Sequence, residues 1–317
     1  MYKSFGFMVC CLLFVTAICG CIGEKDTIKV SGAYALYPMM QIWAEKYHEE
    51  TGIRVEVSGG GAGKGMADAL NGMVDIGMVS RDIYPEEIER GAFYVAVAKD
   101  CVVATINKNN PVIDDILQKG IRREVFVDIF ITRNITTWGE VVGKPSITYP
   151  IHVYTRADQC GAAKTWAKYL GNYTQDDLTN AADSAVDSDP GLAETVRGDN
   201  LGIGYNNLNF AYDVKTGKTV NGIVVVPIDL NEDGTLEDSE KFYDTRDKLI
   251  NAVKNDAYPS PPARELYLAT KDNFAGKAKE FVVWILTEGQ KYVPEHGYIQ
   301  IPEEKLQQEL QDLGQKF

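Results

Sequence analysis

A glycine-rich segment at residues 57–81 constrains this chain more than any other stretch of its sequence. The strand-like run 53–57 leads into a loop with glycine at positions 59, 60, 61, 63 and 65. A helix is predicted to follow, because apolar residues recur at i, i+3, i+4 and i+7 from Met66. Glycine lets backbone N–H groups approach a ligand closely, and a helix N-terminus presents unpaired N–H groups. The segment therefore predicts an anion-binding turn.

The sequence on either side of this loop predicts an open α/β arrangement. A short strand at 28–31 precedes a turn at 32–38 and a helix that ends at Gly52. A buried strand is expected at 74–78, after the glycine loop and its helix. This order of elements places loops after strands, where open α/β sheets usually bind their ligands.

A second α/β segment is predicted further along the chain. The extended apolar run 94–107 is long enough to pass from one domain to another. Apolar runs at 125–131 and 147–154 precede a helix around Trp166 that Gly171 closes. Further strands are expected at 222–228 and 264–270, and helices at 278–286 and 303–313.

Length and composition restrict the class of protein. The chain has 317 residues, which is long enough for two domains with sizeable cores. Apolar residues make up 45% and charged residues 24%, as in ordinary globular proteins. The formal net charge of −13 argues against a nucleic-acid partner, because phosphate backbones require a basic surface. A small anion is still compatible with this charge, because the local field of a pocket decides its binding.

Residues 1–20 predict a lipoprotein signal peptide. Lys3 precedes the apolar run 5–18, which is too short for a comfortable membrane span. The sequence Ile-Cys-Gly-Cys that follows resembles a lipobox, so we expect cleavage and lipidation at Cys21. An ordinary signal peptide or a signal anchor is the alternative. A lipid anchor would hold the folded chain at the cell surface, on the periplasmic face of the cell membrane.

Two cysteines lie beyond this segment, Cys101 and Cys160. Two cysteines in a body of this length do not form a disulfide scaffold, and we expect them to be unpaired. The glycosylation sequons at Asn134 and Asn172 matter only in a host that glycosylates its surface proteins.

Several motifs together resemble the phosphate-binding lipoproteins of ABC transporters, which have the type 2 periplasmic-binding-protein architecture. The resemblance implies an α/β fold of two lobes joined by crossing strands, with the ligand cleft between the lobes. On this basis the first lobe would comprise residues 21–106 and 257–317, and the second lobe residues 107–256. The matching stretches are 32–38, the glycine loop with 75–81, 135–138, 156–162, 201–205 and Tyr258-Pro259.

The resemblance also implies which residues meet the ligand, although several side chains differ from the family pattern. Where the family has a hydroxyl-rich turn, this chain has Gly-Ala-Tyr-Ala at 32–35, and a family serine pair falls on residues 62 and 63. The serine-glycine-threonine that follows the family arginine is Cys-Gly-Ala here. The implied ligand-binding set is Ala33, Tyr34, Ala35, Leu36, Ala62, Gly63, Ser80, Arg156, Cys160, Gly161 and Ala162.

The missing hydroxyls give backbone amides and Arg156 a larger role in this predicted site. A hydrogen bond to a charged group is worth roughly 1.5–3 kcal/mol, so backbone amides at 32–36 and 62–65 are expected to replace several of them. Arg156 could form a bidentate contact with an oxyanion. A surface salt bridge is the alternative role of this side chain.

We therefore expect a monomeric lipoprotein that captures an oxyanion, phosphate first, and delivers it to an ABC transporter permease. This role requires no cofactor. Two alternatives are open: a binding protein for tungstate, molybdate, sulfate or a small organic anion, and a calcium-braced envelope protein for sensing or adhesion.

A separate motif at residues 229–240 matches the twelve-residue calcium loop. Oxygen donors fall at positions 1, 3, 5, 7, 9 and 12 of the motif, with glycine at position 6 and an apolar residue at position 8. The motif predicts a structural Ca²⁺ that braces the second lobe, and an acidic turn without metal is the alternative. The predicted ligands are Asp229, Asn231, Asp233, Thr235 and Glu240.

Other charged or nucleophilic side chains have simpler explanations. Arg81 could pair with a carboxylate such as Asp82 or Glu86 instead of meeting a ligand. Cys160 with His152 could suggest nucleophilic catalysis, but a glycine-rich cleft fits ligand capture better. We therefore expect no enzymatic activity.

Overall fold

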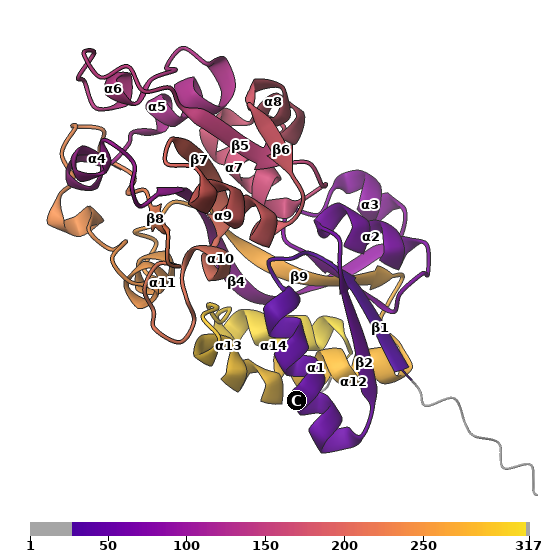
Figure 1. The fold of residues 1–317 in the computed structure, drawn as a ribbon. Coiled ribbons are helices and arrows are strands. Elements are labelled where there is room, and N and C mark those ends of the chain that lie inside the picture. Colours follow the sequence, from indigo (N-terminus) through magenta and orange to yellow (C-terminus); the bar gives the residue numbers. More distant parts are fainter. Residues whose placement is uncertain (1–26, 315–317) are drawn as a thin grey trace, which may run out of the picture.

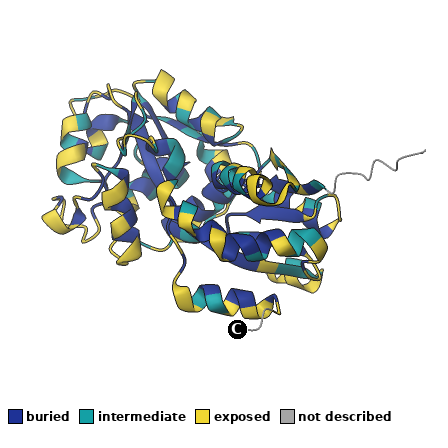
Figure 2. Ribbon diagram, turned by 90° about the horizontal axis from the view of Figure 1, so that it is seen from below, coloured by how far each residue is buried: buried dark blue, intermediate teal, exposed yellow. Residues whose placement is uncertain are grey.

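The computed structural model describes residues 27–314 and shows two lobes (Figure 1). Each lobe has its own hydrophobic core: we call lobe 1 the part packed around Trp43 and Phe281, and lobe 2 the part packed around Trp138 and Trp166. Figure 2 shows buried residues inside both lobes and exposed residues on the outer helices. The predicted two-lobed α/β architecture is confirmed, whereas the signal segment and Cys21 lie outside the described residues.

Lobe 1 contains both ends of the described chain. Its N-terminal elements are β1 (Thr27–Gly32), α1 (Tyr37–Thr51), β2 (Arg54–Gly59), α2 (Ala62–Leu70), β3 (Ile76–Val79) and α3 (Pro85–Glu89). Its C-terminal elements are α12 (Gly276–Leu286), the 3₁₀ turn η3 (Glu288–Lys291), α13 (Tyr292–Glu295) and α14 (Glu303–Asp312). As the sequence predicts, Gly52 ends α1 in the left-handed conformation, with φ of 75°.

Lobe 2 is built from the middle of the chain. It begins with α4 (Ile113–Lys119), α5 (Arg123–Val127), the π-helical turn η1 (Asp128–Thr132), α6 (Trp138–Val141), β5 (His152–Arg156) and α7 (Gly161–Gly171). It continues with α8 (Gln175–Ala181), β6 (Ser184–Val186), α9 (Asp189–Gly198), β7 (Gly202–Asn207) and α10 (Leu208–Ala211). It ends with β8 (Ile223–Val225), the 3₁₀ turn η2 (Asp238–Glu240) and α11 (Arg246–Lys254).

Two long antiparallel strands, β4 (Ala92–Asn107) and β9 (Ala263–Lys271), connect the lobes through one sheet of order β2-β1-β3-β9-β4-β7-β5-β6. The first part of β4 pairs with β9, and from Val102 onward β4 pairs with β7. Ala98 belongs to the core of lobe 1 and Cys101 to that of lobe 2, so β4 crosses between the cores within three residues. The lobe boundaries at 106/107 and 256/257 stay a prediction.

The apolar run 125–131 of the second α/β segment is helical. It lies in α5 and η1, which place Phe126 and Phe130 on one face. Both rings pack edge-on against Trp166, with centroids 5.3 and 5.8 Å from the indole. The helix spacing of the two aromatic rings, i and i+4, therefore decides the local structure here.

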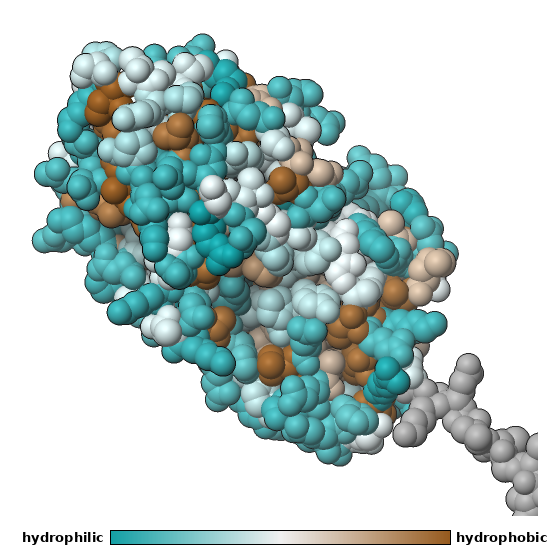
Figure 3. All heavy atoms as spheres, in the orientation of Figure 1, coloured by the Kyte–Doolittle hydropathy of each residue, from teal (hydrophilic) through white to brown (hydrophobic). Residues whose placement is uncertain are grey.

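The visible surface is mainly hydrophilic, with hydrophobic patches that are small and separated (Figure 3). Among the described helices, none combines the length and the apolar character needed to cross a membrane.

The glycine loop is fixed to the sheet by close backbone contacts. A Cβ atom on Gly65 would lie 2.4 Å from the carbonyl oxygen of Met78 and 2.8 Å from the Cα of Gly32. Only glycine at this position lets α2 pack directly on β1 and β3. The packing therefore sets where the N-terminus of α2 points.

We predict that Gly65→Ala lowers the free energy of unfolding by about 1–3 kcal/mol, because the added methyl group meets backbone that cannot move aside. Urea unfolding followed by circular dichroism measures this change. Gly198→Ala is the matched control, since a Cβ atom there meets nothing within 4 Å. Equal effects of the two substitutions would contradict the packing argument.

Candidate functional site

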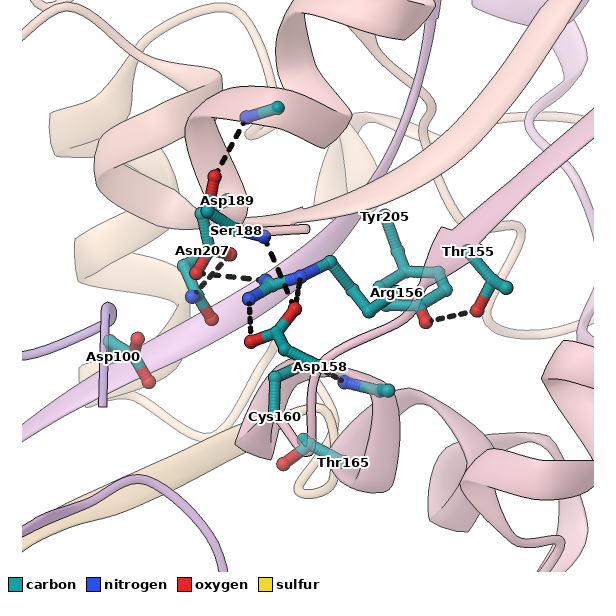
Figure 4. Close-up of polar contacts among 12 residues, drawn as sticks. Asp100, Thr155, Arg156, Asp158, Cys160, Thr165, Ser188, Asp189, Tyr205 and Asn207 are labelled. Atoms are coloured by element: carbon teal, nitrogen blue, oxygen red, sulfur yellow. Dashed lines mark hydrogen bonds and ion pairs between the residues drawn. The ribbon is translucent and has the colours of Figure 1, made fainter. Parts of the chain in front are cut away.

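Arg156, the last residue of β5, is completely buried between two carboxylates (Figure 4). Its Nε and Nη2 atoms donate to the carboxylate of Asp158 at 2.7 and 2.6 Å. Its Nη1 atom lies 2.9 Å from Oδ2 of Asp189. Burial alone would lower the pKa of this guanidinium, but the neighbouring charges keep it raised, so Arg156 is permanently cationic. Arg156 thus forms salt bridges, as the alternative role predicts, but they are buried rather than at the surface.

This ion pair continues as a chain of polar contacts toward the strands that join the lobes. Asn207, at the end of β7, donates to Asp189 at 2.7 Å and accepts from Nη2 of Arg264. Arg264 on β9 in turn binds Asp100 on β4 at 2.8 and 3.2 Å. The arginine at the candidate site is thus connected to both crossing strands.

The two lobes touch directly beside Arg156. The N–H of Gly63, in the first turn of α2, donates to the carbonyl of Gln159 at 3.2 Å. A Cβ atom on Gly161, the first residue of α7, would lie 2.2 Å from the carbonyl oxygen and from Oγ of Ser80. The N-termini of α2 and α7 therefore meet at one place, with Arg156 next to them.

Tyr34 is the aromatic side chain of this site. Its ring lies against Gly59 and stands 5.8 Å from the guanidinium carbon of Arg156. Burial, followed by the negative charge of Asp158, raises the pKa of this phenol. Tyr34 is therefore a neutral hydrogen-bond donor facing the ion pair.

Most of the other predicted ligand residues contribute only backbone. The side chains of Ala33, Ala35, Leu36 and Ala62 belong to the core of lobe 1, and those of Cys160 and Ala162 to the core of lobe 2. Some predicted amides already have acceptors: Ala33 donates to Met78, Leu36 to Ala33 and Gly65 to Gly61. The amides of Gly161 and Ala162 begin α7, where no intrahelical acceptor exists for them.

Cys160 is buried and caps α7, and its Sγ accepts the N–H of Ala163 at 3.2 Å. Burial raises the pKa of this thiol to about 11, although Arg156 opposes the shift. Cys101 and Cys160 are both free thiols. A thiol with this pKa is protonated at neutral pH and is not an activated nucleophile.

Arg81 has a structural partner that the sequence did not identify correctly. It forms two short bonds with the carboxylate of Glu87, 2.8 and 2.6 Å long, rather than pairing with Glu86 or the Asp82 carboxylate. Glu87 also caps the start of α3. Arg81 thus holds the segment that follows Ser80.

A cavity of about 550 Å³ lies between the lobes alongside α7, but none of the predicted ligand residues lines it. Its walls include Tyr84, Lys164, Arg264 and Tyr267. The predicted residues lie where the two lobes touch each other. A site there is therefore indicated by the contacts around Arg156 and not by this cavity.

The sequence did not indicate the two carboxylates that hold Arg156, or the side-chain amide of Asn207 that holds one of them. Asp158 is two residues away, a spacing that puts both side chains on the same side of an extended chain and could have suggested the pair. Asp189 and Asn207 come from elements far along the chain, and no local spacing indicates the contact of Asp189 with Arg156 or that of Asn207 with Asp189.

The predicted calcium residues lie in the loop before η2 and within η2 itself. Among residues 27–314, no group of three or more His, Cys, Asp or Glu side chains stands in metal-binding geometry.

A two-lobed α/β chain with helix N-termini and a buried arginine meeting between its lobes is built as a ligand-binding protein. The chain belongs to the PBP superfamily, because the PBP superfamily domain matches residues 23–288. This family consists of substrate-binding proteins rather than enzymes.

Several proteins that are similar to this chain are named as phosphate-binding or substrate-binding proteins. The phosphate-binding protein PstS of Methanocaldococcus jannaschii is 25% identical, with 93% of this chain and 91% of that protein covered. PstS of Bacillus subtilis is 24% identical, with 94% of each covered. A Clostridium perfringens structure, described as a phosphate ABC transporter substrate-binding protein with bound phosphate, superposes with a TM-score of 0.69 at 24% identity, covering 87% of this chain and all of that one. At 24% identity, the similarity to the Clostridium perfringens structure shows a shared fold.

We predict that Asn207→Ala lowers the free energy of unfolding by about 1–3 kcal/mol, because Asp189 and Arg264 each lose a buried partner. Urea unfolding measures the change, and Asn200→Ala on an exposed loop is the control. If both variants unfold alike, the polar chain behind Arg156 has no structural importance.

Proposed function

We propose that this protein captures inorganic phosphate between its lobes and delivers it to an ABC transporter permease. The observation that carries the proposal is the meeting of the α2 and α7 N-termini beside the buried Arg156. Amides of a helix N-terminus favour an anion, and Arg156 retains two of its five N–H groups after its three carboxylate contacts. The names of the similar PstS proteins support phosphate as the anion.

The charge around Arg156 also supports phosphate over the other oxyanions. One guanidinium faces two carboxylates, Asp158 and Asp189, so this group of three carries a net charge of −1. Sulfate, molybdate and tungstate are fully deprotonated, so they would be repelled by these carboxylates and could not donate a hydrogen bond to them. Phosphate keeps a proton at neutral pH and can donate a hydrogen bond to a carboxylate.

The remaining parts of the proposal concern the setting of this site. Capture by the cleft itself needs no cofactor, and any calcium would be structural, in the loop 229–240. We further propose that the chain acts as a monomer outside the cell membrane, held there by a lipid on Cys21. The motif at residues 18–21 supports the anchor.

We predict that Arg156→Ala weakens phosphate binding by at least tenfold, because the site loses its positive charge. Isothermal titration calorimetry in phosphate-free buffer measures the affinity. Arg54→Ala is the control, since the Arg54 side chain is 67% exposed. Arg156→Lys, which keeps the charge, is the second variant if Arg156→Ala fails to fold. A folded Arg156→Ala protein with an unchanged isotherm would refute the assignment of the site.

A second prediction tests the contact of the lobes without changing any charge. Gly161→Ala should weaken phosphate binding at least tenfold, because the methyl group meets Ser80 and holds the lobes apart. Thermal unfolding should change little, since each lobe keeps its own core. Gly198→Ala again serves as the matched control, and equal affinity of both variants would argue against a site at this contact.

A titration panel decides among the alternatives. Phosphate should bind more tightly than sulfate, molybdate, tungstate or small carboxylates. Tighter binding of another anion of the panel would identify that anion as the ligand. If none of the anions binds, the sensing or adhesion alternative is favoured.

A further inference from the structure

The loop 229–240 contains two buried carboxylates that lack a cationic partner. Asp229 is 1% exposed and Glu240 is 4% exposed. Within the described chain, no Lys, Arg or His forms an ion pair with either of them. A buried carboxylate without a cationic partner must be compensated by hydrogen bonds, and a buried oxygen that has none favours a positive charge beside it.

Both carboxylates are turned into the loop. Oδ2 of Asp229 accepts the N–H of Gly234 at 2.8 Å, while its Oδ1 is buried without any hydrogen-bond partner. Oε1 of Glu240 accepts the N–H groups of Leu230 and Asn231 at 2.6 and 3.2 Å, and its Oε2 accepts the N–H of Glu237 at 3.0 Å. The orphaned oxygen of Asp229 is the observation that distinguishes this loop from an ordinary acidic turn.

We propose that the loop is a calcium site of lobe 2 that stabilises the fold independently of the anion site. Oxygen is the ligand that Ca²⁺ prefers, and six to eight oxygens are needed. Asp229 is the anchoring ligand, Glu240 closes the loop, and Asn231, Asp233 and the backbone carbonyl of Thr235 complete the set. Because the described carboxylates do not yet form a metal-binding cluster, the ion would draw the loop around Asp229.

The backbone of the loop favours calcium over magnesium. Gly234 makes the sharp turn at position 6 in a left-handed conformation, with φ of 85°. Leu236 at position 8 is buried and fastens the loop to the protein. A flexible loop that supplies many oxygens suits Ca²⁺, whereas Mg²⁺ requires near-ideal octahedral geometry.

The site would join two distant parts of lobe 2. The N–H of Asp229 donates to the carbonyl of Ile121, and that of Leu236 to the carbonyl of Gln118. A Cβ atom on Gly120 would lie 2.9 Å from the backbone nitrogen of Asp229. An ion held by Asp229 therefore tightens the connection between the loop and the end of α4.

The test uses the whole protein, freed of metal with EDTA and kept in phosphate-free buffer, with CaCl₂ as the probe. One Ca²⁺ should bind per chain, with a Kd of about 1 mM or tighter, as in extracellular calcium modules. The melting temperature should rise with CaCl₂ and rise less with the same concentration of MgCl₂. Absence of calcium binding to the wild-type protein would overturn the proposal.

A matched pair of variants locates the ion. Asp229→Asn should weaken calcium binding at least tenfold, whereas Asp238→Asn, the same change on a side chain that is 99% exposed, should leave binding unchanged. Glu240→Gln is the second variant if Asp229→Asn does not fold. Calcium binding that survives both the Asp229→Asn and the Glu240→Gln changes would overturn the assignment of the loop.

Discussion

The buried guanidinium of Arg156, held between Asp158 and Asp189, is the interaction on which the candidate site depends. Moving a charged group out of water costs several kcal/mol, and removal of one partner of a buried pair costs about 3–5 kcal/mol. The end of β5, the loop after it and the start of α9 therefore have to keep their relative positions. The ion pair fixes the position of Arg156 but adds little net stability, because the cost of removing both charges from water largely cancels their attraction.

The contacts that fix Arg156 extend to β4 and β9, the strands that cross between the lobes. Asp189 is tied through Asn207 to Arg264 and Asp100, which lie on the strands that cross between the lobes. A movement of β4 against β9 would strain the buried Asp100–Arg264 pair and the contacts beyond it. The position of Arg156 is therefore connected, through hydrogen bonds and ion pairs, to the strands that join the lobes.

The sequence predicted the parts of the fold that rest on local patterns. The glycine loop, the end of α1 at Gly52 and the extended crossing strand follow from spacing and from Gly and Pro positions, whereas α7 is capped by Asn172 and not by the predicted Gly171. The sequence assigned no element to the apolar run 125–131, which is helical because two aromatic rings on one face pack against Trp166. It also missed Asp189 and Asn207, because a contact between residues far apart in sequence exists only once β5, β7 and α9 have assembled.

The alanines at the predicted site have a physical explanation in the two cores. Ala33, Ala35 and Ala62 pack inside lobe 1, and Ala162 packs inside lobe 2, so these positions serve the lobes rather than the ligand. A hydroxyl at such a position would need a ligand or a backbone acceptor, since a buried polar group without one is destabilising. On the function proposed above, binding depends on groups the fold already fixes: helix N-terminal amides, the hydroxyl of Ser80 and the charge of Arg156. In that proposal the site would discriminate by charge and protonation more than by a ring of hydroxyls, and the carboxylates beside Arg156 would be the main source of selectivity.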